Sequence, residues 1–361
     1  MNERVNLKIK DLEIFVINVL KKCGLNEEDA KITTDVLLLA DKRGIESHGV
    51  ARLKRYVNGI KQGTIKINNN IKIIKETPVS IVIDGEGGMG QLIAYKTMKQ
   101  CIEKAKKNLI CFATIRNSNH YGIAGYYTLM ALKEDMIGIS LTNSAPLVVP
   151  TFAKDAVIGT NPISVGIPAN KEKPFLLDMA TSTVPRGKLE VYARLGEPIS
   201  KLWATDENGI ETNDASKVLT NLIDRRGGGL SPLGGSSELT GGHKGYGLGV
   251  LVDIFSGIFS SGAVGTDVYG KKGETSGVCH FLGVINPEAF SGIDVIKKNM
   301  DYYIKMLKDS EKCSSQNRIY IAGEKEFESE KRNVDKLNIQ DKVFSTLNLI
   351  GKEFNLELKI T

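Results

Sequence analysis

The hydrophobic periodicity of this chain changes twice along its length, and this limits the folds that it can adopt. Up to about residue 60, apolar side chains recur at helical spacing, so that Leu12, Phe15 and Val19 share one face. From about residue 79, short β-branched runs alternate with glycine-rich turns, and helical spacing returns after about residue 290. The sequence therefore predicts an α/β protein with a sheet in the middle and helices at both ends.

The predicted elements can be given by residue range. We expect helices at 11–23, 26–40, 50–60, 92–105, 293–307 and 339–354, and one more after the glycine-rich stretch 227–249. We expect strands at 79–84, 110–115, 137–142, 163–167, 175–178 and 278–285, and a hairpin at 203–212. The chain contains no internal repeat.

Composition and charge exclude several classes of protein. The net charge is only +6 over 361 residues, and no basic run interleaved with aromatic residues indicates nucleic-acid binding. The five cysteines show no CxxC spacing, which indicates a reducing compartment rather than a disulfide framework. The first ten residues include charged side chains and no apolar run suited to a signal peptide. The longest apolar stretch, 248–259, is too short to span a bilayer. We therefore expect a soluble, cytoplasmic protein with no nucleic-acid or membrane partner.

One glycine motif resembles a dinucleotide-binding fingerprint. Residues 85–90 read G-x-G-x-x-G and lie between a predicted strand and a predicted helix. The fingerprint also requires an acidic residue at the end of the next strand, to hold the ribose hydroxyls. That strand ends at 114–117 without a carboxylate. We therefore interpret this motif as a strand-to-helix turn and do not assign a cofactor to it.

Three of the four histidines lie in turns that are rich in glycine or small polar residues. These are His48, His120 and His243, whereas His280 lies in an apolar strand, where a hydrogen-bonded core histidine is the competing interpretation. No HxH or HxxxH pair and no Cys/His cluster has zinc spacing. We therefore assign no metal, although distant histidines could still combine into a site.

The spacing of His48, Arg52 and Tyr56 predicts one helix face if the helix begins at His48. Imidazole, guanidinium and phenol together suit a small carboxylate with a hydroxyl or keto group, because arginine binds carboxylates through two parallel hydrogen bonds. The alternative is an exposed polar helix face.

His120 follows a predicted strand and is placed as an active-site acid or base would be, with a simple loop histidine as the alternative. Further along, a glycine-rich stretch at 234–249 leads into a helix and carries Lys244. Backbone amides at such a helix N-terminus favour a phosphate, although no P-loop pattern is present. A surface loop is the alternative interpretation of this stretch.

Five motifs in order make the chain resemble the malate/L-lactate dehydrogenase family, which also includes sulfolactate and ureidoglycolate dehydrogenases and some diketo-acid and imine reductases. The motifs are Arg43–Arg52, Asn117–Gly125, Gly159–Ile163, Asp178–Ser182 and Gly242–Leu248. The resemblance runs from about residue 10 to the C-terminus. The sequence departs from the usual pattern at Pro185, Asp253 and Cys279, where alanine, glutamate and glycine are commoner.

The resemblance implies a non-classical α/β fold that is not a Rossmann domain. It implies a three-layer, mixed-sheet cofactor domain with helical segments from both chain ends beside it, in a homodimer. We accordingly divide the chain into 1–75, a helical segment with substrate residues, 76–290, the NAD-binding sheet domain, and 291–361, a helical segment that packs with the first.

The resemblance also implies roles for individual residues. His48, Arg52, Tyr56 and His120 would line the substrate site, with Arg52 holding the carboxylate and one histidine exchanging the hydroxyl proton. We favour His120 for the proton and His48 for orienting the substrate. The residues expected to contact the cofactor are Ser144, Asp178, Met179, Ala180, His243, Lys244, Gly323 and Glu324.

The implied activity is a hydride transfer between a 2-hydroxy acid and NAD, or NADP. Malate with oxaloacetate is the first choice of substrate pair, and lactate, sulfolactate and ureidoglycolate are alternatives. An imine or diketo-acid reductase on the same scaffold is a further alternative. A cofactor-binding protein without turnover would be expected to lack His48, Arg52 or His120, and all three are present.

Overall fold

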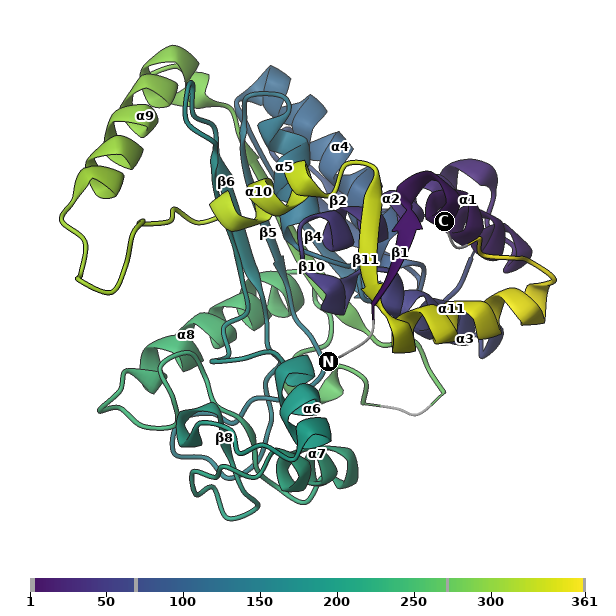
Figure 1. The fold of residues 1–361 in the computed structure, drawn as a ribbon. Helices are drawn as coiled ribbons and strands as arrows, with labels where there is room; N and C mark the ends of the chain where they lie inside the picture. Colours follow the sequence, from purple (N-terminus) through teal and green to yellow (C-terminus); the bar gives the residue numbers. More distant parts are fainter. Residues whose placement is uncertain (1–3, 68–70, 271–272, 360–361) are drawn as a thin grey trace.

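The computed structural model describes residues 4–67, 71–270 and 273–359 and places a seven-stranded sheet at the centre of the molecule (Figure 1). The strands, in spatial order, are β2 Lys72–Glu76, β3 Ser80–Asp84, β4 Ile110–Ser118, β10 Val278–Ile285, β5 Ile137–Thr142, β6 Ile163–Ile167 and β7 Phe175–Met179. Of these described strands only β3 and β4 run parallel, and the other neighbouring pairs are antiparallel. A Rossmann sheet is mostly parallel. The mixed sheet confirms the predicted non-Rossmann α/β class.

Helices cover both faces of this sheet, which gives three layers. On one face, α4 (Gly90–Asn108) and α5 (Gly125–Leu132) bury Met98 and other apolar side chains against strands β3, β4 and β10. On the other face lies α8 (Gly242–Asp253), which continues as a π-helical turn at 254–258. Here Val252 packs with Phe281 of β10. The central strand β10 is therefore buried on both faces along nearly its whole length, whereas β3 and β6 alternate between buried and half-buried residues.

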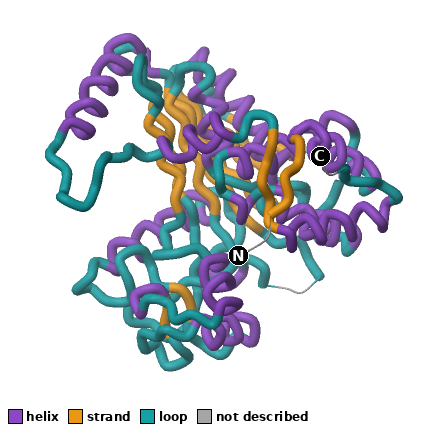
Figure 2. Tube along the Cα trace, in the orientation of Figure 1, coloured by secondary structure: helices purple, strands orange, loops and turns teal. Residues whose placement is uncertain are grey.

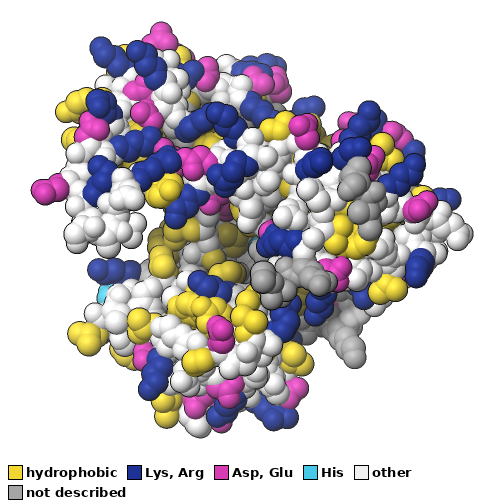
Figure 3. Space-filling model, viewed as in Figure 1, with side chains coloured by type: hydrophobic (Ala, Val, Ile, Leu, Met, Phe, Trp, Pro, Cys, Tyr) yellow, Lys and Arg dark blue, Asp and Glu magenta, His cyan; other side chains and the backbone are white. Residues whose placement is uncertain are grey.

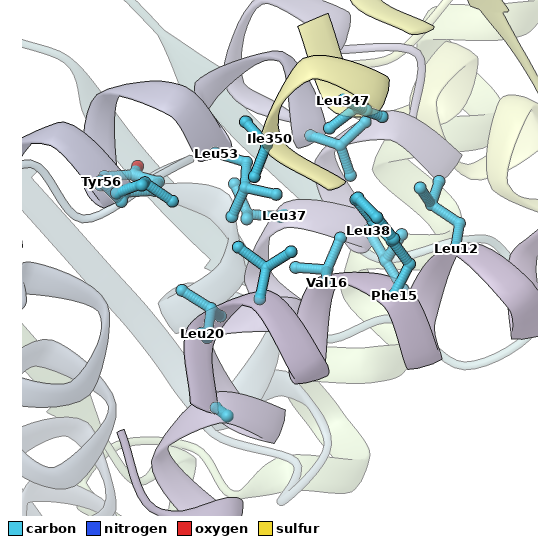
Figure 4. Packing of buried hydrophobic residues seen from close by; sticks show 14 of the residues in the cluster. Leu12, Phe15, Val16, Leu20, Leu37, Leu38, Leu53, Tyr56, Leu347 and Ile350 are labelled. Atoms are coloured by element: carbon cyan, nitrogen blue, oxygen red, sulfur yellow. The ribbon is translucent and has the colours of Figure 1, made fainter. Parts of the chain in front are cut away.

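The two ends of the chain share one hydrophobic cluster beside the sheet. Strands β1 (Arg4–Lys8) and β11 (Lys336–Gln340) pair antiparallel, and four helices pack around them. The helices are α1 Ile9–Lys22, α2 Glu27–Lys42, α3 Leu53–Lys61 and α11 Asp341–Phe354. Figure 4 shows side chains of α1, among them Leu12, lying close to Leu347 of α11. Helical segments from both ends of the chain thus share one core, while the division of the chain at 75 and 290 stays a prediction.

A smaller lobe is inserted between β7 and β10 and packs around a hydrophobic cluster of its own (Figure 2). It contains α6 (Arg186–Leu195), α7 (Ala215–Asp224) and the short strands β8 (Ala204–Thr205) and β9 (Gly229–Leu230), which pair antiparallel. Leu189 on the inner face of α6 is fully buried in this cluster. The lobe therefore holds α6 as a fixed helix beside the central sheet.

The C-terminal part begins with α9 (Ile293–Asp309), which stands away from the helices around it at the upper left of Figure 1. The carboxylate of Asp301 accepts hydrogen bonds of 2.8–3.1 Å from the backbone amides of residues 170–172 and so attaches α9 to the loop after β6. Helix α10 (Glu324–Arg332) then crosses to α2, where Glu330 forms an ion pair of 2.9 Å with the buried guanidinium of Arg43.

Most predicted elements are present, with boundaries shifted by a few residues, but three features differ. Strands β1, β2, β9 and β11 and helices α5, α6, α7 and α10 were not predicted. The expected helix at 50–60 is a 3₁₀ turn at 50–52 followed by α3, and the expected helix at 339–354 begins only at Asp341. The expected hairpin is reduced to a bridge between Thr205 and Glu211. Among the described residues no helix is long and apolar enough to cross a membrane.

Candidate active site

Two histidines that are far apart in the sequence stack on each other beside the central sheet. The ring centroids of His48 and His120 lie 5.4 Å apart, with 21° between the ring planes. Tyr56 of α3 lies on the same cluster, and its phenol oxygen is 2.7 Å from Nδ1 of His120. Nδ1 of His48 is 2.9 Å from the hydroxyl of Ser47. With Nδ1 held in both rings, the Nε2 atoms are the ones left for a substrate.

The backbone around His48 differs from the prediction, since His48 and Arg52 do not lie on one continuous helix. His48 ends a 3₁₀ turn, and Gly49 is extended, with φ −84° and ψ −150°. The reason is Asp41 of α2, whose carboxylate accepts a 2.7 Å hydrogen bond from the amide of Val50. A Cβ on Gly49 would lie 1.9 Å from Oδ1 of Asp41. The buried carboxylate therefore needs a glycine here, and the resulting turn brings His48 toward His120.

His120 is held by the loop that follows β4. The side-chain amide of the preceding residue, Asn119, donates 2.9 Å hydrogen bonds to the carbonyl groups of Gly87 and Gly88. The amide of Gly87 in turn donates to the carbonyl of Asn117 at 2.7 Å. The G-x-G-x-x-G turn therefore uses its backbone groups to anchor the His120 loop. This agrees with the interpretation of the motif as a strand-to-helix turn.

Two arginines accompany the histidines. Arg52 donates from Nε to the carbonyl of Ser47 at 2.5 Å, so its guanidinium stays beside His48. Arg55, one turn of chain further on, binds the phenol of Tyr269. Both arginines line a cavity of about 490 Å³, together with the two histidines. A carboxylate in this cavity would meet guanidinium donors next to two imidazoles.

This cavity is the candidate substrate cavity. Besides Tyr269, three further parts of the fold line it. The end of β5 contributes residues from Thr142 to Ser144, the loop before β6 contributes Thr160, and α6 of the small lobe contributes Arg186 and Glu190. The cavity thus lies where the helical ends of the chain, the sheet and the small lobe meet.

The environment of the two histidines favours their neutral form. Burial lowers the pKa of His48 to about 4, and the positive charges of Arg52 and Arg55 act in the same direction. Burial, followed by the charge of Arg55, holds the pKa of His120 well below its usual value. At neutral pH both imidazoles are therefore uncharged and able to accept a proton.

The predicted cofactor residues fall on two cavities and one helix end. Ser144 lines the substrate cavity, and its hydroxyl accepts a 3.0 Å hydrogen bond from the amide of Thr160. Asp178 and Gly323 line a second cavity of about 390 Å³. The carboxylate of Asp178 accepts a 2.8 Å hydrogen bond from the amide of Gly125, and burial raises its pKa to about 6.

The other predicted cofactor residues are arranged differently. His243 and Lys244 are exposed on the first turn of α8, and Met179 and Ala180 are half-buried at the end of β7. The buried carboxylate of Glu324 forms ion pairs with Lys308 and Arg318, which ties α10 to α9. The side chain of Glu324 therefore has a structural partner on this chain.

His280, which the sequence left between a core and a site role, is a fully buried core residue. Its Nδ1 lies 2.7 Å from the hydroxyl of Thr142 and its Nε2 lies 2.8 Å from that of Ser118. Its ring stacks on Tyr121 at 4.4 Å. Thr142 and Tyr121 both line the substrate cavity, so His280 supports the cavity wall from behind. No three His, Cys, Asp or Glu side chains in the described ranges gather in a way that could hold a metal ion.

Among the side chains of the substrate cavity that sequence reasoning missed are Arg55, Arg186, Glu190 and Tyr269. Arg55 directly precedes Tyr56, and Arg186 follows the unusual Pro185, so both stood next to residues that had been singled out. Glu190 and Tyr269 carried no signal, because only the packing of α6 and of the loop before β10 brings them to the cavity.

Comparison with known proteins agrees with this arrangement. The family model described as malate/L-lactate dehydrogenase matches residues 7–348. A malate dehydrogenase of Pyrococcus abyssi is 50% identical over 354 residues, which is 98% of this chain and 96% of that protein. A malate/(S)-sulfolactate dehydrogenase of Methanothermus fervidus is 40% identical over 95% of this chain and 96% of its own length.

A crystal structure of a malate dehydrogenase from Entamoeba histolytica superposes with a TM-score of 0.94 at 36% identity and covers 99% of both chains. The similarity therefore extends from the sequence motifs to the whole architecture, including the sheet and both helical ends. This chain belongs to the malate/L-lactate dehydrogenase family.

Proposed function

We propose that this protein interconverts malate and oxaloacetate with a nicotinamide cofactor. The observation that carries the proposal is the convergence of two neutral histidines and the Arg52 guanidinium on one cavity. These groups provide a proton acceptor and a carboxylate ligand side by side, which a 2-hydroxy acid requires. The names of the relatives from Pyrococcus abyssi and Methanothermus fervidus support malate as the first substrate to test.

The residues of the two cavities fit a dinucleotide. A hydroxyl at Ser144 and a carboxylate at Asp178 are polar groups in two separate cavities, as recognition of the two ends of an extended cofactor would need. The exposed first turn of α8, with Lys244, suits the phosphates between them. We propose NAD rather than NADP, because the Asp178 carboxylate would accept hydrogen bonds from ribose hydroxyls and would repel a 2′-phosphate.

The bound nicotinamide would supply hydride acceptance from C2 of the hydroxy acid, or hydride donation to C2 of the keto acid. The protein's own part is to bind, orient and exchange a proton. Arg52 would hold the C1 carboxylate. The neutral imidazole of His120, in the tautomer that donates from Nδ1 to the Tyr56 oxygen, would take the proton of the hydroxyl at Nε2. His48, stacked on His120, would orient the same hydroxyl. In the reverse direction His120 would return the proton to the keto oxygen.

The reaction can be tested by following oxidation of NADH and NADPH by the purified protein. The panel contains oxaloacetate, pyruvate, sulfopyruvate, 2-oxoglutarate, a diketo acid and a cyclic imine. Fastest turnover of oxaloacetate with NADH is expected, and a clear preference for the cyclic imine or the diketo acid would replace the proposal by the reductase alternative. Tight binding of NADH without turnover of any compound would favour a cofactor-binding protein.

Two variants test the assigned roles. Arg52→Ala is expected to lower kcat/KM for keto acids, because the charged partner of the carboxylate is lost. The corresponding loss of transition-state binding is several kcal/mol. His120→Ala is expected to lower kcat by roughly 10²-fold or more. If only His48→Ala has that effect, the roles of the two histidines are reversed.

We also propose that the protein forms a homodimer through the face that carries α9. Figure 3 shows a hollow on this face with hydrophobic side chains gathered in it, below α9 and above the small lobe. Helix α9 itself exposes the apolar side chains of Val295, Tyr302 and Met306. Monomeric proteins seldom expose so much apolar side chain in one region, and a second copy of this chain would cover it.

Light scattering during gel filtration tests the dimer, with a mass of twice 39.4 kDa expected. Tyr302→Glu, which places a charge on the exposed face of α9, should shift the protein toward the monomer. Leu349→Glu on α11 is the matched control, since Leu349 is comparably exposed but lies on another face. A monomer at all concentrations of the unmodified protein would exclude this assembly.

A further inference from the structure

The substrate cavity carries more positive charge than one carboxylate needs. Its ionised side chains are three arginines, Arg52, Arg55 and Arg186, and one glutamate, Glu190. The two histidines of the same wall add no charge when neutral. The wall therefore has an excess of two positive charges, which a ligand with two anionic groups would balance.

The three arginines are not equally engaged. Arg52 is bound to the Ser47 carbonyl beside the histidines, and Arg55 is bound to Tyr269. Arg186 donates from Nε to Glu190 at 3.1 Å, and within the described ranges its guanidinium makes no other hydrogen bond or ion pair. Because Glu190 occupies only the Nε position, the two terminal nitrogens of Arg186 remain available for a planar anion.

The position of Arg186 is fixed by the small lobe rather than by the histidine cluster. Pro185 precedes α6 in an extended conformation, with φ −74° and ψ 152°, and Arg186 is the first residue of the helix. Leu189, one turn later, is fully buried and anchors α6 in the lobe. Proline is favoured at a helix start because its φ is already restricted. The Pro185–Arg186 pair thus places a guanidinium at a rigid helix end on the wall of the cavity.

Arg186 and Glu190 lie close enough to Arg52 for their charges to act on its guanidinium, with Arg186 opposing and Glu190 favouring its ionised form. Arg52 and Arg186 therefore belong to one electrostatic cluster, although they come from different parts of the fold. Both guanidinium groups line the same cavity, so a ligand bound there lies between walls that carry both charges.

We propose that Arg186 binds a second acid group of the substrate, at the end away from the carboxylate held by Arg52. The substrate class is accordingly a 2-hydroxy acid with a carboxylate or a sulfonate at its other end, in preference to lactate. Glu190 acts as a positioning residue that holds the Arg186 side chain through Nε. The inference rests on the proposed hydride-transfer function and adds a specificity residue to it.

The expected preference for a dianionic keto acid over one with a methyl group depends on whether Arg186 gains an anionic partner. A dianionic keto acid pairs both guanidinium groups, and each pair is a charge-assisted, bidentate interaction. A keto acid with a methyl group in place of the second acid would place an apolar group against the guanidinium of Arg186. Its two terminal nitrogens would then lack an anionic partner, while Nε keeps Glu190, and this is unfavourable. Discrimination therefore comes from the unpaired arginine as much as from the paired one.

The test compares keto acids that differ only in the second group. We would measure kcat/KM with NADH for oxaloacetate, sulfopyruvate and pyruvate in the unmodified protein, Arg186→Gln and Arg186→Lys. In Arg186→Gln the ratio of oxaloacetate to pyruvate efficiency should fall by roughly 10- to 100-fold, mainly through KM. Arg186→Lys should give an intermediate ratio, because lysine keeps the charge but not the bidentate geometry.

Arg194→Gln is the matched control, since Arg194 lies on the same helix but lines a different cavity. Its substrate ratio should stay unchanged. Equal losses for oxaloacetate and pyruvate in Arg186→Gln, or no change in their ratio, would overturn the proposal. If Arg186→Gln loses the preference over pyruvate for only one of oxaloacetate and sulfopyruvate, the proposal is supported. The acid group of that compound is then the one that Arg186 binds.

Binding without turnover separates this inference from the proposed function. Calorimetric titration of malate and of lactate into the protein with NADH should show tighter binding of malate, and Arg186→Gln should remove most of that difference. If the protein turns over no keto acid but the difference appears and depends on Arg186, the proposed function fails and the dianion site stands. If malate and lactate bind equally, the dianion site fails.

Discussion

The phenol oxygen of Tyr56 and Nδ1 of His120 lie 2.7 Å apart, although 64 residues separate them in the sequence. Tyr56 is buried in the first turn of α3, and His120 lies in the loop after β4. This hydrogen bond therefore joins the N-terminal helices to the sheet at the candidate active site. It fixes the orientation of the His120 ring and so determines which nitrogen faces the substrate cavity.

Tyr56→Phe should therefore impair turnover more than folding. The variant keeps the ring volume and removes one hydrogen bond, whose net contribution is about 1 kcal/mol, so kcat should fall about fivefold. Steady-state kinetics checks this. Tyr126→Phe is the matched control, because Tyr126 donates a hydrogen bond of equal length to Asp35 away from the site. An equal fall in kcat in both variants would exclude a specific role for Tyr56.

The kcat/KM values of the two reaction directions should depend differently on pH. Oxidation needs a neutral histidine, and burial together with Arg55 holds the pKa of His120 well below its usual value. The kcat/KM for oxidation should thus stay level from about pH 6 to about pH 8. Reduction needs the protonated histidine, so its kcat/KM should fall about tenfold per pH unit over this range.

Arg55→Gln offers a check on the cause of that pH dependence. Removal of the cation makes protonation of His120 more favourable, so the acidic limb of the oxidation profile should move to higher pH. A break near pH 6.5 in the unmodified protein would contradict the lowered pKa, and an unchanged profile in Arg55→Gln would contradict the influence of Arg55.

Asp41 should make the free energy of unfolding depend on pH. Burial raises its pKa from 3.8 to about 7, so the folded state binds a proton more tightly than the unfolded state does. The resulting stabilisation is complete below about pH 4 and is lost as the pH rises through 7, at about 1.4 kcal/mol per pKa unit. In Asp41→Asn, urea unfolding between pH 4 and pH 8 should lack this decline. If the free energy of unfolding depends on pH in the same way in both proteins, this contribution of Asp41 is excluded.

The shared core of the two chain ends predicts a large effect of one leucine. Leu347 of α11 is 1% exposed in the cluster that also holds Leu12 and Phe15 of α1. Leu347→Ala should lower the free energy of unfolding by about 3 kcal/mol, through lost burial and the cavity left behind. Leu349→Ala, on the same helix but 62% exposed, should cost far less. Denaturant unfolding of the two variants would reveal a similar loss if α11 did not pack on α1.

Strands within the sheet were the elements that the sequence predicted best. The ranges 137–142, 163–167 and 278–285 match β5, β6 and β10 to the residue, because each is a largely apolar run that an asparagine or a proline ends. By contrast, β1 and β11 carry lysines at their paired ends, Lys8 and Lys336, and look like charged linkers. Their pairing depends on a partner more than 300 residues away, and no local pattern records such a partner.

The candidate site was predicted in part. Spacing grouped His48, Arg52 and Tyr56, but for the wrong reason, since Gly49 interrupts the helix that the spacing assumed. The three side chains converge because Asp41 holds the turn between them and because Tyr56 binds His120. Neither contact has a local signature, so the residues could be found from the sequence while their geometry could not.

The sequence by itself determined the α/β class, the family and the residue types that the chemistry requires, because periodicity and short motifs are local properties of the chain. Only the tertiary structure decided the strand order, the pairing of the two chain ends and the charge of the substrate cavity. The cavity forms where α3, the loop after β4 and α6 of the small lobe meet. Arg186 and Arg52 therefore line the same cavity because distant segments of the chain pack together. Such packing is non-local, and no local sequence pattern predicts it.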